Sequence, residues 1–227
     1  MLQKGISLKI LCISDQIDPL VYSSNIKERF SDVDLVLSAG DLPLDYLDFI
    51  VSSLNKPVFF VFGNHHTNEL RFYRKTYNTP VDIIQLNSFE YGCGAIHLGT
   101  KVKKEGDFIL AGFGGSMRYN NGENQFTDFQ MFIEAARLIP HLFWNRIIYG
   151  RFLDILLTHA PPKGIHDKND KCHWGFKAYL WFMKVFKPKY LVHGHIHLYD
   201  LSEVRCTKWK NTTVINAYSH YIIDDNI

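Results

Sequence analysis

The segment Gly63-Asn64-His65-His66 directly follows the apolar run Pro57-Val58-Phe59-Phe60-Val61-Phe62. Such a run is typical of a strand that is buried on both faces, as in the middle of a parallel sheet. In open α/β folds the residues after such strands lie at the carboxyl edge of the sheet, where ligands bind. Here they offer an amide oxygen and an imidazole, which suit a metal ion and a transferring phosphoryl group. A polar turn would explain four such residues taken alone, so the interpretation depends on how the other strands end.

The composition is that of a globular protein with a sizeable core. The chain has 227 residues, of which 46% are hydrophobic and 21% charged. No long linker divides it, so we expect a single domain over residues 1–227. The net charge of +2 gives no strong signal for nucleic acid. No apolar run approaches the roughly 20 residues of a transmembrane segment, and no signal peptide is evident. Four cysteines without a C-x-x-C pair predict reduced thiols and a cytoplasmic location.

The first third of the chain alternates strands and helices. Strands are expected at residues 8–13, 33–37 and 57–62, and helices at 25–30 and 44–54. This order, with short loops, predicts a parallel sheet with right-handed crossovers.

The middle of the chain follows a different pattern. We expect strands 95–99 and 107–112 to form a hairpin around the polar segment 101–106, so that the sheet becomes mixed or a second sheet begins. Thr127 is expected to cap a helix to about residue 138, and residues 142–152 to continue as an aromatic, weakly basic helix or lid.

The last third predicts strands at 153–157 and 189–192, a helix at 175–186, and closing strands at 212–216 and 218–223. Residues 178–186 are apolar nearly all round, which is typical of a buried helix. A dimer interface or a membrane-surface patch is the second interpretation of this helix and of residues 142–152. A homo-oligomer is therefore compatible with the sequence.

Five of the expected strands end in side chains that bind metal ions. These side chains are, in chain order, Asp15, Asp41, Asn64 with His65, His159, and His195 with His197. Because such strands share one carboxyl edge, residues that are scattered in sequence converge in space. Carboxylates, imidazoles and an amide oxygen are ligands of Mn²⁺, Fe²⁺ or Zn²⁺. The repetition favours a metal site over a set of unrelated turns.

The series resembles the calcineurin-like metallophosphoesterase family, whose pattern runs D-x-H, G-D, G-N-H, H and G-H-x-H. In this chain the blocks are Asp15-Gln16-Ile17, Gly40-Asp41, Gly63-Asn64-His65, His159 and Gly194-His195-Ile196-His197. The resemblance implies an α/β (α+β) fold of four layers, with a central mixed two-sheet β-sandwich flanked by helices. It also implies a metal-dependent phosphoester hydrolase, a phosphodiesterase or phosphatase that uses a metal-bound hydroxide on a substrate whose identity stays open.

The resemblance further implies two divalent metal ions, with Mn²⁺ favoured and Fe or Zn as alternatives. Asp41 would bridge both ions. The remaining ligands would be Asp15 and His197 for the first ion, and Asn64, His159 and His195 for the second. His65 would lie just outside the ions, as general acid or transition-state stabiliser.

The chain departs from the family pattern at Ile17, which stands where a histidine is expected and has no lone pair to offer. The first metal site therefore lacks one ligand and is expected to be weak or empty, unless Gln16, Asp18 or a water substitutes. One interpretation keeps catalysis with weak first-site binding. The other is a catalytically weak or inactive binding or scaffold protein of the same fold. The presence of His65 favours catalysis. His66 also stands where the family usually has an acidic residue.

The glycine- and asparagine-rich loop 114–122 offers candidate substrate-binding residues. Arg118, together with Tyr119 and Asn121, could bind a phosphate, because a guanidinium group donates two parallel hydrogen bonds to phosphate oxygens. A plain surface turn explains the loop equally well.

Overall fold

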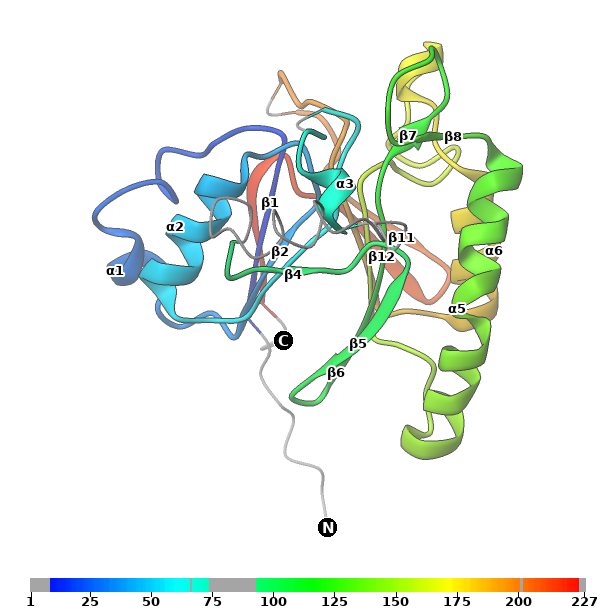
Figure 1. Cartoon of the computed structure of the whole chain (residues 1–227), viewed down its shortest axis with the longest axis horizontal. Helices are drawn as coiled ribbons and strands as arrows, with labels where there is room; N and C mark the ends of the chain where they lie inside the picture. Colours follow the sequence, from blue (N-terminus) through cyan, green and yellow to red (C-terminus); the bar gives the residue numbers. More distant parts are fainter. Residues whose placement is uncertain (1–8, 66, 74–92, 201, 225–227) are drawn as a thin grey trace, which may run out of the picture.

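The structure is a computed structural model that describes residues 9–65, 67–73, 93–200 and 202–224 (Figure 1). Within these residues the first sheet has five strands in the order β13-β1-β2-β3-β4. Its strands are β1 (Lys9–Ser14), β2 (Leu35–Ser38), β3 (Val58–Phe60), β4 (Ile96–His97) and β13 (Ser219–Asp224). β1 to β4 are parallel, and β13 pairs antiparallel with β1.

The second sheet has six strands in the described part of the chain, in the order β11-β12-β10-β9-β6-β5. They are β5 (Lys101–Glu105), β6 (Phe108–Phe113), β9 (Ile155–Thr158), β10 (Tyr190–His193), β11 (Cys206–Trp209) and β12 (Thr212–Asn216). The four inner strands are parallel and the two outer strands antiparallel. A small separate ladder joins β7 (Ser116–Met117) to β8 (Gln125–Phe126).

Helices cover the outer faces of the two sheets, as Figure 1 shows. The helices beside the first sheet are α1 (Ile26–Phe30), α2 (Leu44–Leu54) and α3 (Leu70–Tyr73). Those beside the second sheet are α5 (Asp128–Tyr149) and α6 (Lys177–Phe186), with the short 3₁₀ helix η1 (Lys171–His173) before α6. One buried cluster lies under α1 and α2, another between the sheets, and a third under α5 and α6. The predicted mixed two-sheet sandwich flanked by helices is confirmed.

The hairpin prediction at residues 95–112 assigned the wrong residues to the first strand. The polar segment 101–106 is not a connection, because Lys101–Glu105 forms strand β5 and pairs antiparallel with β6. Residues Ile96–His97 instead pair parallel with β3 in the first sheet. β5 is an outer strand whose exposed lysines keep it polar, and charged edge strands of this kind resist pairing with other chains.

The expected helical segments on either side of Pro140 form one helix, α5, which has Pro140 inside it. Its start is the predicted one: the Thr127 side chain accepts from the Gln130 backbone N–H, and the Gln130 side chain accepts from the Thr127 backbone N–H. Leu138 and Leu142, on either side of the proline, are both buried in the same core. This packing offsets the lost backbone hydrogen bond, which costs about 3 kcal/mol.

Helix α6 is the buried helix that its composition predicts. Ala178, Tyr179, Phe182, Met183 and Phe186 are buried against the second sheet and α5. None of the helices that the structure describes is long and apolar enough to cross a bilayer.

Candidate metal centre

The candidate ligands follow the carboxyl ends of five strands: β1, β2, β3, β9 and β10. Asp15 follows β1 and Asp41 follows β2, while Asn64 lies four residues beyond β3. His159 follows β9, and His195 and His197 come after β10. These strands are parallel within each sheet. Contacts of His159 with Asp41 and of His195 with Asp15 show that the carboxyl ends of both sheets meet at one edge of the sandwich. His66 lies outside the described residues.

Glycines in the sequence motifs let the strand ends approach closely. A Cβ on Gly63 would lie 2.0 Å from Oδ1 of Asp41, and one on Gly194 would lie 2.6 Å from Oδ2 of Asp15. Neither position therefore accepts a larger side chain without displacing a carboxylate. Asp15, Asp41 and His195 themselves have φ values of 63°, 57° and 66°. A left-handed backbone at three non-glycine residues is strain of a kind that clusters at functional sites.

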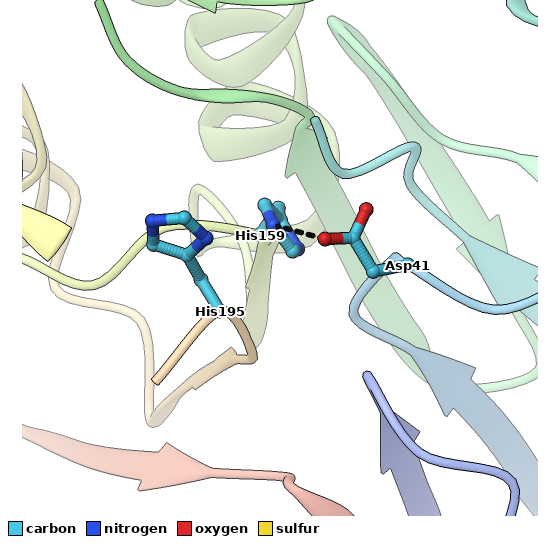
Figure 2. Close-up of side chains that lie close together, drawn as sticks. All are labelled: Asp41, His159 and His195. Atoms are coloured by element: carbon cyan, nitrogen blue, oxygen red, sulfur yellow. Dashed lines mark ion pairs between the residues drawn. The ribbon is translucent and has the colours of Figure 1, made fainter. Parts of the chain in front are cut away.

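The side chains of Asp41, His159 and His195 form a group whose candidate ligand atoms all lie within 4.8 Å of one another (Figure 2). Nε2 of His159 is 3.3 Å from Oδ2 of Asp41 and 3.1 Å from Oδ1 of Asn64. The structure therefore brings together a carboxylate, two imidazoles and an amide oxygen. This donor set fits a borderline-hard divalent ion.

Hydrogen bonds to backbone carbonyls orient both imidazoles. Nδ1 of His159 donates to the carbonyl oxygen of Ala39 at 2.8 Å, which leaves Nε2 toward Asp41 and Asn64. Nε2 of His195 donates to the carbonyl oxygen of Cys172 at 2.7 Å, which leaves Nδ1 as its ligand atom. Such partners fix the tautomer of a metal-binding histidine. Sequence reasoning missed both, because backbone carbonyls carry no residue-type signal.

The charges in the group are strongly coupled. Burial alone would raise the pKa of the Asp41 carboxyl, but the adjacent His159 imidazole outweighs burial and lowers it. Burial alone would lower the pKa of His159, and the Asp41 carboxylate instead raises it to about 9. Burial lowers the pKa of His195 to about 3, so its ring is neutral. The opposite shifts of Asp41 and His159 have the same cause, which is the close approach of the two side chains.

Asp15 and His197 lie beside this group and are less closely associated with it. The buried carboxylate of Asp15 accepts from the His195 backbone N–H at 3.0 and 2.9 Å, and burial raises its pKa. Nε2 of His197 is 3.8 Å from Oδ1 of Asp15. Nδ1 of His197 pairs with the Tyr199 hydroxyl at 3.0 Å. The donors predicted for the first ion are thus fewer and looser than those predicted for the second.

The residues around Ile17 do not supply an obvious replacement ligand. The Ile17 side chain is 41% exposed. Oε1 of Gln16 accepts from the Tyr218 hydroxyl at 2.6 Å. The Asp18 carboxylate accepts from the Ser219 hydroxyl at 2.6 Å and pairs with His220. Both candidate substitutes named from the sequence are therefore engaged with strand β13 or the residue before it.

His65 lies at the rim of the group. Its backbone N–H donates to Oδ1 of Asp41 at 2.8 Å, and its side chain is exposed. The backbone contact holds residue 65 beside the cluster and leaves its imidazole free to meet a ligand from solvent.

In loop 114–122, Tyr119 reaches the cluster: the Asn64 amide Nδ2 donates to its hydroxyl at 3.2 Å. Arg118 donates instead to the carbonyl oxygen of Gln125 and to Oε1 of Gln130. Arg118 also lines a cavity of about 1040 Å³ against β5 and α5, to which none of the candidate metal ligands contributes. Asn121 is exposed. Of the three residues that the sequence analysis named in this loop, Tyr119 is the one that contacts a predicted metal ligand in the structure.

A second group of potential ligands lies on η1 and its N-cap, where Asp170, Cys172 and His173 offer atoms within 4.8 Å of one another. Oδ1 of Asp170 accepts from the Cys172 thiol and from His173, as expected of a residue that caps a short helix. The His173 ring centroid is 5.4 Å from that of His195. The segment 163–174 between β9 and α6 therefore forms one wall of the site.

The family model for the calcineurin-like phosphoesterases matches residues 8–199, which is most of the chain. The chain belongs to this family. The resemblance read from the motif order is confirmed. Membership implies metal-dependent phosphoester hydrolysis in general terms, and the family typically binds a dinuclear metal centre.

Solved structures support the same fold. One is 14% identical with a TM-score of 0.65 and covers 96% of this chain and 95% of its own. TT1561 of Thermus thermophilus is 12% identical with a TM-score of 0.58, over 93% and 89% of the two chains. GAP50 of Plasmodium is 10% identical with a TM-score of 0.51, over 92% and 71%. No curated protein matches this calcineurin-like phosphoesterase in sequence.

Proposed function

We propose that this family member hydrolyses phosphoesters with divalent ions held at the shared edge of its two sheets. The observation that carries the proposal is the convergence of ligand atoms from Asp41, His159 and His195 within 4.8 Å of one another. The side-chain carbonyl oxygen of Asn64 lies against Nε2 of His159 in the same group. These residues come from four different strand ends, and their donor atoms are those of a divalent-metal site. Family membership supplies the reaction class.

Asn64, His159 and His195 would hold the second ion, with Asp41 shared between both ions. Asp15 and His197 would complete the first site. Divalent ions held by these residues would supply an activated water and would polarise the phosphoryl oxygens. Mn²⁺ is the favoured metal, with Fe or Zn as alternatives, because imidazole, amide and carboxylate ligands suit all three.

His65 serves as the general acid of the proposed reaction. A water releases one proton to solvent, its oxygen bonds to phosphorus, and the bond from phosphorus to the leaving-group oxygen breaks. The protonated imidazole of His65 gives its proton to that oxygen, so that an alcohol departs. Its exposed side chain, anchored by the backbone contact to Asp41, supports this assignment.

A non-catalytic binding or scaffold protein of the same fold is the second candidate function. Two observations favour it: Ile17 supplies no ligand, and the Asp15 carboxylate already accepts the His195 N–H. This alternative predicts no hydrolysis with any metal. Phosphate-binding roles for Arg118 and Asn121 also stay proposals. We place the protein in the cytoplasm, because all four cysteines are free thiols.

The deciding experiment measures hydrolysis of a chromogenic phosphodiester and of the matching monoester by metal-stripped protein, with Mn²⁺, Fe²⁺ or Zn²⁺ titrated in. The test variant is Asn64→Ala. Asn211→Ala, which removes an exposed amide in the turn between β11 and β12, is the matched control. We expect metal-dependent hydrolysis in the wild type and in the control, and its loss in Asn64→Ala. If the folded wild-type protein hydrolyses neither substrate with any of the three ions, the result would support the scaffold alternative.

A further inference from the structure

The second half of helix α5 presents large apolar side chains to solvent. The buried residues of α5 end with Leu142. Beyond it the exposed side chains are Phe143 (51%), Trp144 (63%), Ile147 (74%), Ile148 (52%) and Tyr149 (42%). We refer to these five residues as the apolar end of α5. Clustered exposed apolar residues of this size mark an interaction surface.

The apolar end belongs to a segment without acidic residues. Residues 135–153 contain three arginines and no aspartate or glutamate. Phe143, Trp144, Ile147 and Ile148 follow the i, i+1, i+4, i+5 spacing that places them on one side of a helix. Figure 1 shows this end of α5 extending beyond α6.

Cations lie at the edge of the apolar end. The Lys104 ammonium is 5.5 Å from the Tyr149 ring centroid, and the Arg146 guanidinium is 5.8 Å from the Phe152 ring centroid. Within the described part of the chain, neither cation forms an ion pair with a carboxylate. Exposed tryptophan, tyrosine and isoleucine, with cations at their margin that no carboxylate neutralises, are the pattern of a helix that lies in a membrane interface.

The charge pattern distinguishes between occupants of this surface. A two-fold dimer places the same patch of both copies face to face. Because residues 135–153 hold no aspartate or glutamate, the facing segment of the second copy would offer no carboxylate to Arg146 or Lys104. An anionic lipid surface instead pairs with these cations while its acyl region takes up the apolar side chains.

The position of the apolar end is compatible with an accessible metal centre. α5 ends at Tyr149 and the chain then enters β9 at Ile155, whereas His159 follows the other end of β9. The apolar end is therefore near the amino ends of the strands, and the candidate ligands are at the carboxyl ends.

We propose that the apolar end of α5 docks the protein on the surface of a bilayer that contains anionic lipids. Trp144 and Ile147 enter the boundary between headgroups and acyl chains, and Lys104 and Arg146 contact the lipid headgroups. The interaction is peripheral, and it does not depend on the proposed hydrolysis.

The test is co-sedimentation of the full chain with vesicles of phosphatidylcholine alone or mixed equally with phosphatidylglycerol. We expect binding to the mixed vesicles and little binding to phosphatidylcholine alone. Ile147→Glu should weaken partitioning by about 10- to 100-fold, since it replaces an apolar side chain that enters the bilayer with a charged one. Val204→Glu changes an equally apolar, 65% exposed residue outside α5 and should bind like the wild type.

A double variant, Lys104→Gln with Arg146→Gln, tests the charge contribution separately. Its binding to the mixed vesicles should fall about tenfold or more and lose its salt dependence. Absence of wild-type binding to the mixed vesicles would overturn the proposal, as would unchanged binding of Ile147→Glu. A wild-type dimer in sedimentation velocity that dissociates in Ile147→Glu, without vesicle binding, would assign the surface to a second copy instead.

Discussion

The amide Nδ2 of Asn64, in the loop that follows β3, lies 3.2 Å from the hydroxyl oxygen of Tyr119 in loop 114–122. Because Nδ2 donates to Tyr119, Oδ1 of Asn64 is turned toward Nε2 of His159 at 3.1 Å. A residue of loop 114–122 thus orients a predicted metal ligand.

Tyr119→Phe should weaken metal binding while keeping the ring in place. Loss of a hydrogen bond that orients a ligand typically costs about 10- to 100-fold in metal affinity or activity. Calorimetric titration of metal-stripped protein with Mn²⁺ measures the change. Tyr22→Phe, at an exposed tyrosine that packs against Tyr46 and Phe49 of α2, is the control. Equal Mn²⁺ affinity in both variants would show that Asn64 is oriented by other contacts.

His65→Ala should separate catalysis from metal binding. If His65 is the general acid, turnover falls by a factor of about 10²–10⁴, while the bound metal measured by atomic absorption stays near the wild-type amount. His141→Ala, at an exposed histidine of α5, controls for loss of an imidazole. Parallel loss of metal and activity would assign His65 to the metal site itself.

Ile17→His tests whether the first metal site lacks a ligand. The new imidazole should tighten metal binding there and lower the Mn²⁺ concentration needed for half-maximal activity. Ile17→Leu keeps the apolar character and should behave as the wild type. An unchanged Mn²⁺ requirement in Ile17→His would mean that the missing histidine does not limit the first site.

His97 should make folding stability sensitive to acid. Its ring centroid lies 5.2 Å from those of Phe60, Phe62 and Tyr73. Burial, reinforced by nearby Lys101, lowers its pKa from 6.5 to about 3. The folded state therefore keeps His97 neutral where the unfolded state takes up a proton. The free energy of unfolding should fall as pH drops from about 6.5 toward 3, by up to about 1.4 kcal/mol per pH unit for this group.

His97→Phe removes this proton linkage. Urea unfolding between about pH 7 and pH 4 should show that the free energy of unfolding falls less steeply with decreasing pH in the variant than in the wild type. The difference in free energy of unfolding between the two proteins should therefore change with pH. Other titrating groups cancel in that difference. A difference in the free energy of unfolding that is constant over this range would contradict the lowered pKa of His97.

The strand-end residues could be predicted from sequence because each follows an apolar run that leaves few alternatives to a buried strand. The edge strand β5 could not be predicted, because the sequence Lys101–Glu105 is as polar as a turn. In the described part of the chain this segment is held as a strand by its pairing with β6. Pro140 predicts a break that the packing of Leu138 and Leu142 overrides. The orientation of the site also depends on the carbonyls of Ala39 and Cys172. These contacts follow from tertiary structure alone.

The most direct test of the central claim is an anomalous difference map from crystals soaked in Mn²⁺, recorded at the manganese absorption edge. The proposed function predicts a peak bounded by Asp41, Asn64, His159 and His195, and a weaker peak or none beside Asp15 and His197. Asn64→Ala crystals should lose the main peak. No peak within this group, or manganese only at Asp170, Cys172 and His173, would contradict the assignment of the strand-end residues as the metal centre.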